Sequence, residues 1–222
     1  MKRWILLKIA MLSLYSIVSG ANDLLDQRQG HPDILVDGVN AWSEGNYTLA
    51  HELLHPLSAQ GSAVAQYIIG LMYFRGKVVG KNYKESLKFL NLSAEQGYAR
   101  AQHKLGNIYT GDLLGKPDYR KAIKWFRLAS GQGYAPSQYF LATLYENGDG
   151  IKQDYVRAHM WFSLASGKNI IARDERDRIT KKMTPSQITD AQNMARDCER
   201  KKYKTVNSSN KYPGFCSFNC KD

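Results

Sequence analysis

Apolar, small and polar residues follow one fixed order three times in succession between Ala63 and Asn169. The copies start at Ala63, Ala99 and Ala135 and align without a gap, so the period is 36 residues. Each copy has two segments with apolar residues at helical spacing, joined by a loop and followed by a turn, which predicts helix, loop, helix and turn. Such a helix pair cannot bury its apolar faces alone, so neighbouring pairs must stack into an α/α solenoid.

Particular positions of each copy have a physical role. A small residue in the first helix allows the second helix to approach closely. An Asn or Asp before the second helix accepts hydrogen bonds from its free N–H groups. A glycine after that helix adopts the left-handed conformation that ends it, and Asn169 is expected to do so in the third copy. These positions hold Gly70, Gly106 and Ala142; Asn82, Asp118 and Asp154; and Gly97 and Gly133.

The three copies resemble Sel1-like repeats, relatives of the tetratricopeptide repeat. They follow the pattern AxAQxxLGxxYxxGxGVxxDYxKAxxWxxxAAxQGxA over residues 63–98, 99–134 and 135–169. The third copy departs from the pattern at Ala142 and at its missing terminal glycine. The resemblance implies an all-α fold, an α/α solenoid of Sel1-like or tetratricopeptide-like helix pairs.

An earlier repeat precedes these copies. Counting back one period places Asn46 on the cap position, Ala50 on a small packing position and Gly61 on the terminal glycine. Gly38 lies nine residues before Tyr47, whereas the corresponding separation in the next copy is thirteen. Because the shorter loop is the ordinary tetratricopeptide spacing, residues 34–62 are predicted to form a tetratricopeptide-like opening repeat.

The period stops after Asn169, and residues 170–204 are predicted to form C-terminal capping helices. Thr184 to Gln187 is a capping box with proline at the first helical position, so a helix should start at Pro185. Ile188, Ala191, Ala195 and Cys198 give that helix one apolar stripe. These helices resemble the closing pair that often follows Sel1-like arrays, and we expect them to shield the last repeat from water. That role is favoured over catalytic use of the acids at 174, 175 and 177.

The cysteines are confined to the C-terminal end of the chain, at Cys198, Cys216 and Cys220. In an oxidising compartment this odd number permits one bridge and one free thiol. The favoured pairing joins Cys198 to Cys216 or Cys220 and ties the tail, residues 205–222, to the preceding helix. A metal site of all three cysteines is the weaker alternative, because no histidine follows His159.

The N-terminal segment predicts export. Lys2 and Arg3 precede a short apolar stretch, and small residues end at Ala21, so residues 1–21 read as a signal peptide cut near Ala21, followed by a linker over 22–33. A periplasmic or secreted protein is expected. The alternative is an uncleaved signal segment that anchors the chain to a membrane.

The formal charge of +11 lies on the body of the chain, because residues 22–62 are acidic and the later residues basic. Export separates the chain from most nucleic acid and leaves acidic proteins, anionic envelope polymers or membrane surfaces as partners. A basic surface that only keeps the protein soluble is the simpler alternative.

One stretch spells a zinc-hydrolase signature, since His51, Glu52 and His55 form HExxH. The 36-residue register places it on the second helix of the opening repeat, where Leu53 and Leu54 face the core. Pro56 is expected to disturb helical geometry at His55, and no third ligand appears at a known spacing. We therefore expect no catalytic zinc and no cofactor, with His51 and His55 as weak metal candidates.

The first helix of each copy also has a face whose residues vary from copy to copy. Such a face commonly lines the groove of tetratricopeptide-like solenoids, where peptides or partner helices bind. Arg75, Arg100 and Lys104 would favour an acidic ligand, although the same residues could be plain solvated surface. The candidate binding residues are Ile68, Arg75, Arg100, Lys104, Asn107, Phe140, Thr143 and Asn147.

The sequence therefore favours an exported, non-enzymatic scaffold that binds a protein or peptide on the concave face of its repeats. No catalytic residue is assigned from spacing. The alternative from another class is a peptidoglycan-related binding protein or hydrolase, suggested by cysteine-rich Sel1-like proteins regarded as β-lactamases. Those carry paired cysteines in each repeat, which this chain lacks. A zinc hydrolase is the remote alternative.

Overall fold

The computed structural model describes residues 32–78 and 80–205, with the backbone alone for 32, 33 and 201–205. In this part the chain forms ten helices and no strand. They are α2 (Pro32–Ser43), α3 (Tyr47–Ala59), α4 (Ala63–Arg75), α5 (Tyr83–Glu95), α6 (Ala99–Thr110), α7 (Tyr119–Gly131), α8 (Ala135–Asn147), α9 (Tyr155–Ser166), α10 (Ile170–Thr180) and α11 (Pro185–Thr205). α2 begins two residues inside the predicted linker, because proline fits the first position of a helix. The predicted signal peptide lies outside the described residues.

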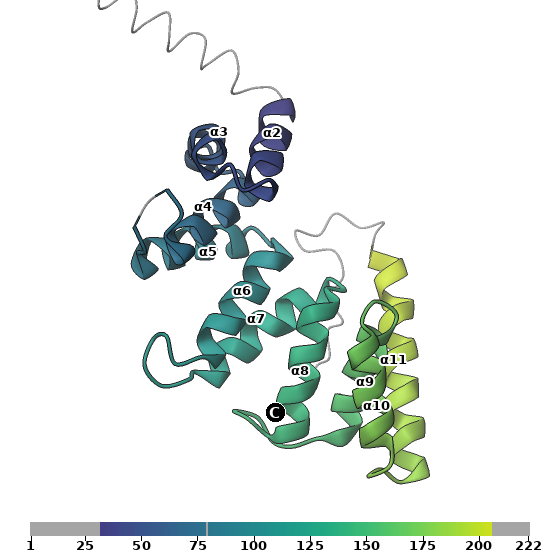
Figure 1. The fold of residues 1–222 in the computed structure, drawn as a ribbon. Coiled ribbons are helices and arrows are strands. Elements are labelled where there is room, and N and C mark those ends of the chain that lie inside the picture. Colours follow the sequence, from purple (N-terminus) through teal and green to yellow (C-terminus); the bar gives the residue numbers. More distant parts are fainter. Residues whose placement is uncertain (1–31, 79, 206–222) are drawn as a thin grey trace, which may run out of the picture. The chain divides into compact units, whose positions relative to one another are not determined.

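Consecutive helices pack in pairs (Figure 1). The chain divides into two compact units after Ser86. In the first unit α3 packs against both α2 and α4; in the second, α7 packs against α6 and α8, and α9 packs against α8. The predicted fold, an all-α solenoid of helix pairs, is confirmed.

The predicted caps begin the second helix of each pair. Side-chain oxygens of Asn46, Asn82, Asp118 and Asp154 accept hydrogen bonds from the backbone N–H three residues later, at 3.3, 3.1, 3.0 and 2.9 Å. Three of these residues also donate their own N–H across the loop, to Tyr73, Tyr109 and Tyr145. Asn46 instead donates to Ala41, five residues back, as the shorter tetratricopeptide-like loop requires.

The turns after these helices follow the prediction in three copies and depart from it in the fourth. Gly61, Gly97 and Gly133 have φ of 97°, 92° and 79°. Asn169 was expected to adopt the same conformation, but its φ is −144°. Its side chain instead accepts hydrogen bonds from Ile171 and Ala172 and caps α10. The prediction was wrong because a further helix starts directly after Asn169, where an N-cap residue needs extended backbone.

A buried glutamine connects each repeat to the preceding one. Gln66, Gln102 and Gln138 occupy the same position of their copies and are almost fully buried. Each donates its Nε2 to a backbone carbonyl eight residues earlier, near the end of the preceding helix, at 3.1, 3.0 and 3.2 Å. The carbonyls belong to Ser58, Ala94 and Ser130. The glutamine thus satisfies an end-of-helix acceptor that the next repeat covers.

Replacing Gln102 with leucine is expected to lower the free energy of unfolding by about 1.5 kcal/mol, because the buried side chain of Gln102 takes part in two hydrogen bonds that leucine cannot form. One bond runs from Gln102 Nε2 to the carbonyl of Ala94, and the other from Gln132 Nε2 to Gln102 Oε1 at 2.8 Å. Urea denaturation measures the loss. The matched control is Gln96→Leu, which removes an exposed glutamine that also bonds a backbone carbonyl. Equal losses in the two variants would contradict the proposed role of burial.

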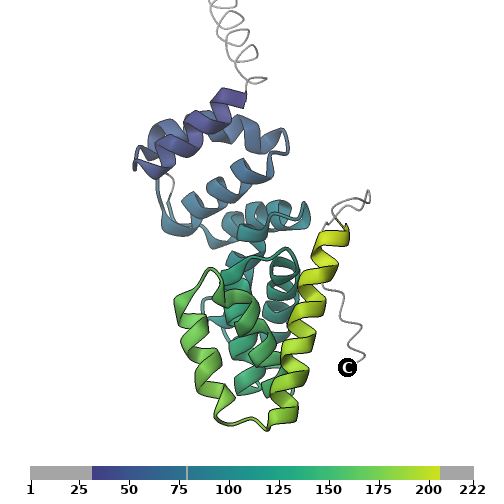
Figure 2. The same cartoon turned by 90° about the vertical axis from the view of Figure 1, so that its right-hand side faces the viewer.

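The capping helices α10 and α11 both pack against α9, and Figure 2 shows α11 as the long yellow helix beside them. α11 starts at Pro185 through the predicted capping box, in which Thr184 N–H donates to Gln187 Oε1 and Gln187 N–H donates to Thr184 Oγ1. Ala191, Ala195 and Cys198 are buried, as their stripe predicts. The two helices therefore cover the last repeat, which is the predicted capping role.

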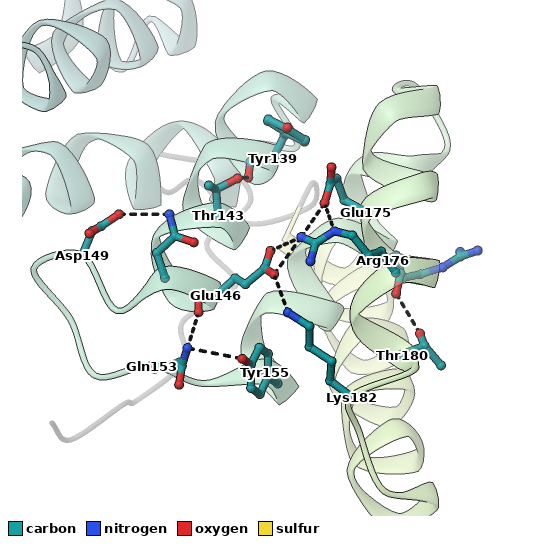
Figure 3. A network of polar contacts seen from close by, with 12 residues as sticks. Tyr139, Thr143, Glu146, Asp149, Gln153, Tyr155, Glu175, Arg176, Thr180 and Lys182 are labelled. Carbon is teal, nitrogen blue, oxygen red and sulfur yellow. Dashed lines mark hydrogen bonds and ion pairs between the residues drawn. The ribbon is translucent and has the colours of Figure 1, made fainter.

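A carboxylate on α8 forms ion pairs that connect α10 to the last repeat (Figure 3). The carboxylate of Glu146 is largely buried, and both of its oxygens accept hydrogen bonds from Arg178 at 2.7 Å. Arg178 also pairs with Glu175, and Lys182 lies 3.8 Å from Glu146. These bonds to Glu146 and Glu175 raise the pKa of Arg178. Among the acids weighed for catalysis, Glu175 and Asp177 thus pair with arginines.

Candidate functional site

The predicted binding face does not extend over the first unit as expected. Ile68 is only 4% exposed and lies in the core. Its assignment to an open face fails because α4 is apolar on nearly every side, and such a helix buries all round. Arg75 is exposed, and its guanidinium lies over the Trp42 ring at 5.4 Å.

In the second unit the candidates fall on two helices, α6 and α8. Arg100 is exposed and Lys104 half-buried one turn later on α6. Phe140 on α8 is 38% exposed. Thr143 donates to the carbonyl of Tyr139 within α8, and Asn147 donates to Asp149 at 3.1 Å, so both are bonded locally (Figure 3). Arg100, Lys104 and Phe140 are therefore the candidates that best present a side chain to a ligand.

A histidine that the sequence analysis had not selected links the two helices. His103 Nδ1 lies 3.0 Å from Ser137 Oγ on α8, and its Nε2 lies 3.0 Å from Asn107 Nδ2 on α6. In a neutral ring, Nε2 accepts from the Asn107 amide while Nδ1–H donates to Ser137. Asn107 therefore points toward His103 rather than toward solvent. Its Oδ1 is buried and has no hydrogen-bond partner within the described residues.

Aromatic rings surround His103. Its ring centroid lies 5.7 Å from Phe126, 5.3 Å from Tyr134 and 5.5 Å from Phe140. Phe140 also stacks on Phe126, with centroids 5.5 Å apart and ring planes at 12°. We call these residues, with Asn107 and Ser137, the His103 cluster. Because Phe126 is fully buried, it gives the exposed ring of Phe140 a rigid support.

The surroundings hold His103 neutral. Burial, with a smaller contribution from the positive charge of Lys104, lowers the pKa of His103 from 6.5 to about 4. At neutral pH the ring is therefore an uncharged hydrogen-bonding group. The positive charges of α6 are those of Lys104, which directly follows His103, and of Arg100, one turn earlier.

Ser137, His103 and Asn107 have the order of a serine, a base and an orienting group, which is the arrangement of a hydrolytic triad. Two observations weigh against that chemistry. Ser137 is fully buried, so its Oγ cannot meet a substrate carbonyl. A base with a pKa of about 4 is also poorly matched to taking a proton at neutral pH. The hydrogen bond between His103 and Ser137 instead connects α6 to α8.

The HExxH stretch lies on α3, and here the structure corrects the sequence interpretation. α3 runs through Pro56 to Ala59, so proline does not disturb helical geometry at His55. The rings of His51 and His55 have centroids 5.1 Å apart. Burial, followed by the charge of His55, lowers the pKa of His51. Within the described ranges no third His, Cys, Asp or Glu joins the pair to form a cluster.

Of the three cysteines predicted to form a disulfide, one lies within the described residues. Cys198 is buried on α11, whereas Cys216 and Cys220 lie outside the described residues, so the disulfide stays a prediction. No helix of the described part is long and apolar enough to cross a membrane.

Comparison with known proteins agrees with this geometry. The family model of the Sel1 repeat matches residues 63–98, 99–134 and 135–169. Residues 63–169 are three tandem Sel1 repeats. Sel1 repeat proteins generally mediate protein–protein interactions. No curated protein matches the chain.

Two solved structures show the same kind of Sel1 fold. One is c5321, a protective antigen present in uropathogenic Escherichia coli strains and displaying an SLR fold. It aligns with a TM-score of 0.63 and 29% identity over 70% of this chain, which spans 34% of that antigen. The other is a Sel1 repeat protein from Oxalobacter formigenes, with a TM-score of 0.54 and 28% identity, covering 58% of this chain and 98% of that one.

Proposed function

We propose that this Sel1 repeat protein is an exported, non-enzymatic interaction module that binds an acidic peptide or protein segment on the α6–α8 face of its second unit. The observation that carries the proposal is the exposed ring of Phe140 on α8, which stacks on buried Phe126 and contacts His103 of α6, the helix that also carries Arg100 and Lys104. Aromatic anchors on a rigid support are typical hot spots, and charges around them select the partner.

The ligand chemistry follows from the charges of α6. Arg100 and Lys104 lie at i and i+4 and therefore on one side of the helix. Lys104 directly follows His103 on α6, and its charge contributes to the lowered pKa of His103. A segment with a carboxylate near a large apolar side chain satisfies both features.

Export rests on the N-terminal sequence pattern. The antigen to which the chain is similar is described as protective, which is in keeping with a protein that leaves the cytoplasm.

A phage-displayed library of random peptides, panned on the immobilised chain, tests the proposal. We expect enrichment of peptides that carry Asp or Glu near a large apolar residue. Reversing both charges, Arg100→Glu with Lys104→Glu, should weaken binding of the selected peptides about tenfold, which corresponds to about 1.4 kcal/mol. Phe140→Ala should weaken it about thirtyfold.

The matched control is Arg120→Glu with Lys124→Glu. It reverses two exposed charges at the same spacing on α7, so it changes the net charge equally. Binding should stay within about twofold of the native chain. Equal losses in the two double variants would indicate a non-specific charge effect. The absence of any acidic enrichment would overturn the proposal.

A further inference from the structure

We propose that α3 carries a transition-metal site in which His51 and His55 chelate one divalent ion, Cu²⁺ most tightly. This site is separate from the proposed peptide surface, since it lies in the first unit. The two histidines are one helical turn apart, and their ring centroids are separated by 5.1 Å.

The separation of the rings fits a shared ion. Histidine nitrogens bind such metals at about 2.0–2.1 Å, so two imidazoles on one ion have centroids about 4.5 Å apart at the right angle that Cu²⁺ prefers and about 5 Å apart at a tetrahedral angle. His55 is exposed and His51 half-buried, so both can rotate a nitrogen toward a common point without opening the core.

The helix holds this spacing because it continues beyond the pair. α3 extends to Ala59 although Pro56 follows His55 directly. On the adjacent side of the helix, Ala50 and Leu54 are fully buried and hold α3 against its neighbours. The chelating pair is therefore pre-organised on a packed helix rather than on a loop, which lowers the entropic cost of binding.

The ligand set defines the kind of site. The described residues offer the two imidazoles and no third metal-binding side chain in a cluster with them. The remaining coordination positions must be filled by water or by a group from another molecule, as in an open site. Two imidazoles favour Cu²⁺, followed by Ni²⁺ and Zn²⁺, and bind Mg²⁺ and Ca²⁺ poorly.

Isothermal titration of the untagged chain with CuCl₂, NiCl₂ and ZnCl₂ tests the site. The expected result is one ion per chain, with Cu²⁺ bound more tightly than Ni²⁺ or Zn²⁺. His51→Ala and His55→Ala should each weaken binding by about tenfold or more, because either change leaves a single ligand. The Cu²⁺ electron paramagnetic resonance spectrum should show coupling to two imidazole nitrogens, which each variant reduces to one.

His31→Ala is the control, because it removes a histidine outside the pair and should leave affinity within about twofold. Three results would overturn the proposal: binding weaker than millimolar, an unchanged affinity in the His51 variant, or a loss in the His31 variant equal to that in the His51 variant. Circular dichroism of each variant verifies that α3 is still formed.

Discussion

Replacing Gly106 with alanine is expected to lower the free energy of unfolding of the second unit by about 2 kcal/mol. A Cβ at position 106 would lie 2.4, 2.6 and 2.7 Å from three ring atoms of Phe126. Phe126 is fully buried and stacks on Phe140, so its ring cannot move aside freely. Three contacts below 3.0 Å put this overpacking at the upper end of the usual range, about 3 kcal/mol. Alanine's better helix propensity returns only about 1 kcal/mol.

Ala142 provides the matched control, because it occupies the same repeat position in α8. Ala142→Gly should cost about 1 kcal/mol through lost helix propensity and lost packing. Urea denaturation at neutral pH compares the two variants. The close approach of α6 and α7 would be disproved if Gly106→Ala were more stable than the native chain, as helix propensity alone predicts. Because Phe126 supports Phe140, the same variant should also weaken binding of the selected peptides.

The features that sequence predicted well depend on neighbours within a few residues. An Asx cap bonds an N–H three residues later, so Asn46, Asn82, Asp118 and Asp154 can be read from local spacing. The capping box before α11 is local in the same way. The repeat period then extends these local predictions to the whole array, since each helix pair must stack on the next.

The His103 cluster was missed because it depends on how one repeat stacks on the next. His103 and Asn107 are an i, i+4 pair that sequence could have flagged on α6. Ser137, however, lies 34 residues away, and only the packing of α8 beside α6 brings its hydroxyl to the imidazole. The same position holds tyrosine in the other copies, at Tyr67 and Tyr139, so the period marks it as an aromatic packing site. Tyr139 contacts Phe162 much as His103 contacts Phe126.

The candidate binding face was predicted too broadly for a related reason. The repeat register predicts the same exposed side for the first helix of every copy. Ile68 lies on that side but is buried, because an apolar side chain packs into the core wherever neighbours can cover it. The side chain of Asn107, another candidate, is engaged by His103. Variation between copies therefore does not by itself define an open face, because the exposure of each side chain differs from copy to copy.

Lowering the pH from 7 is expected to destabilise the second unit through His103. Its pKa in the folded chain is about 4, because burial and Lys104 disfavour the charged ring, whereas the ordinary value is 6.5. Below pH 6.5 the unfolded chain takes up a proton that the folded chain does not, so stability falls as the pH falls. The contribution is fully present above pH 6.5 and is lost by about pH 4.

The size of this loss follows from the two pKa values. The difference between the two pKa values limits the loss in the free energy of unfolding to about 3 kcal/mol. Solvent around the half-buried ring reduces this loss to about 2 kcal/mol, of which about 1 kcal/mol occurs by pH 5. Burial and Arg176 also lower the pKa of His159, which therefore acts in the same direction. The difference between the native chain and a His103 variant isolates the contribution of His103.

Urea denaturation of the native chain and of His103→Gln at pH 7, 6 and 5 measures that difference. Glutamine offers an amide in place of the imidazole and does not titrate, so the variant should lose about 1 kcal/mol less stability than the native chain between pH 7 and pH 5. The variant's stability at pH 7 does not enter this comparison, because only the change with pH is compared. Parallel losses would show that His103 titrates near its ordinary pKa, and that burial and the charge of Lys104 do not keep the ring neutral.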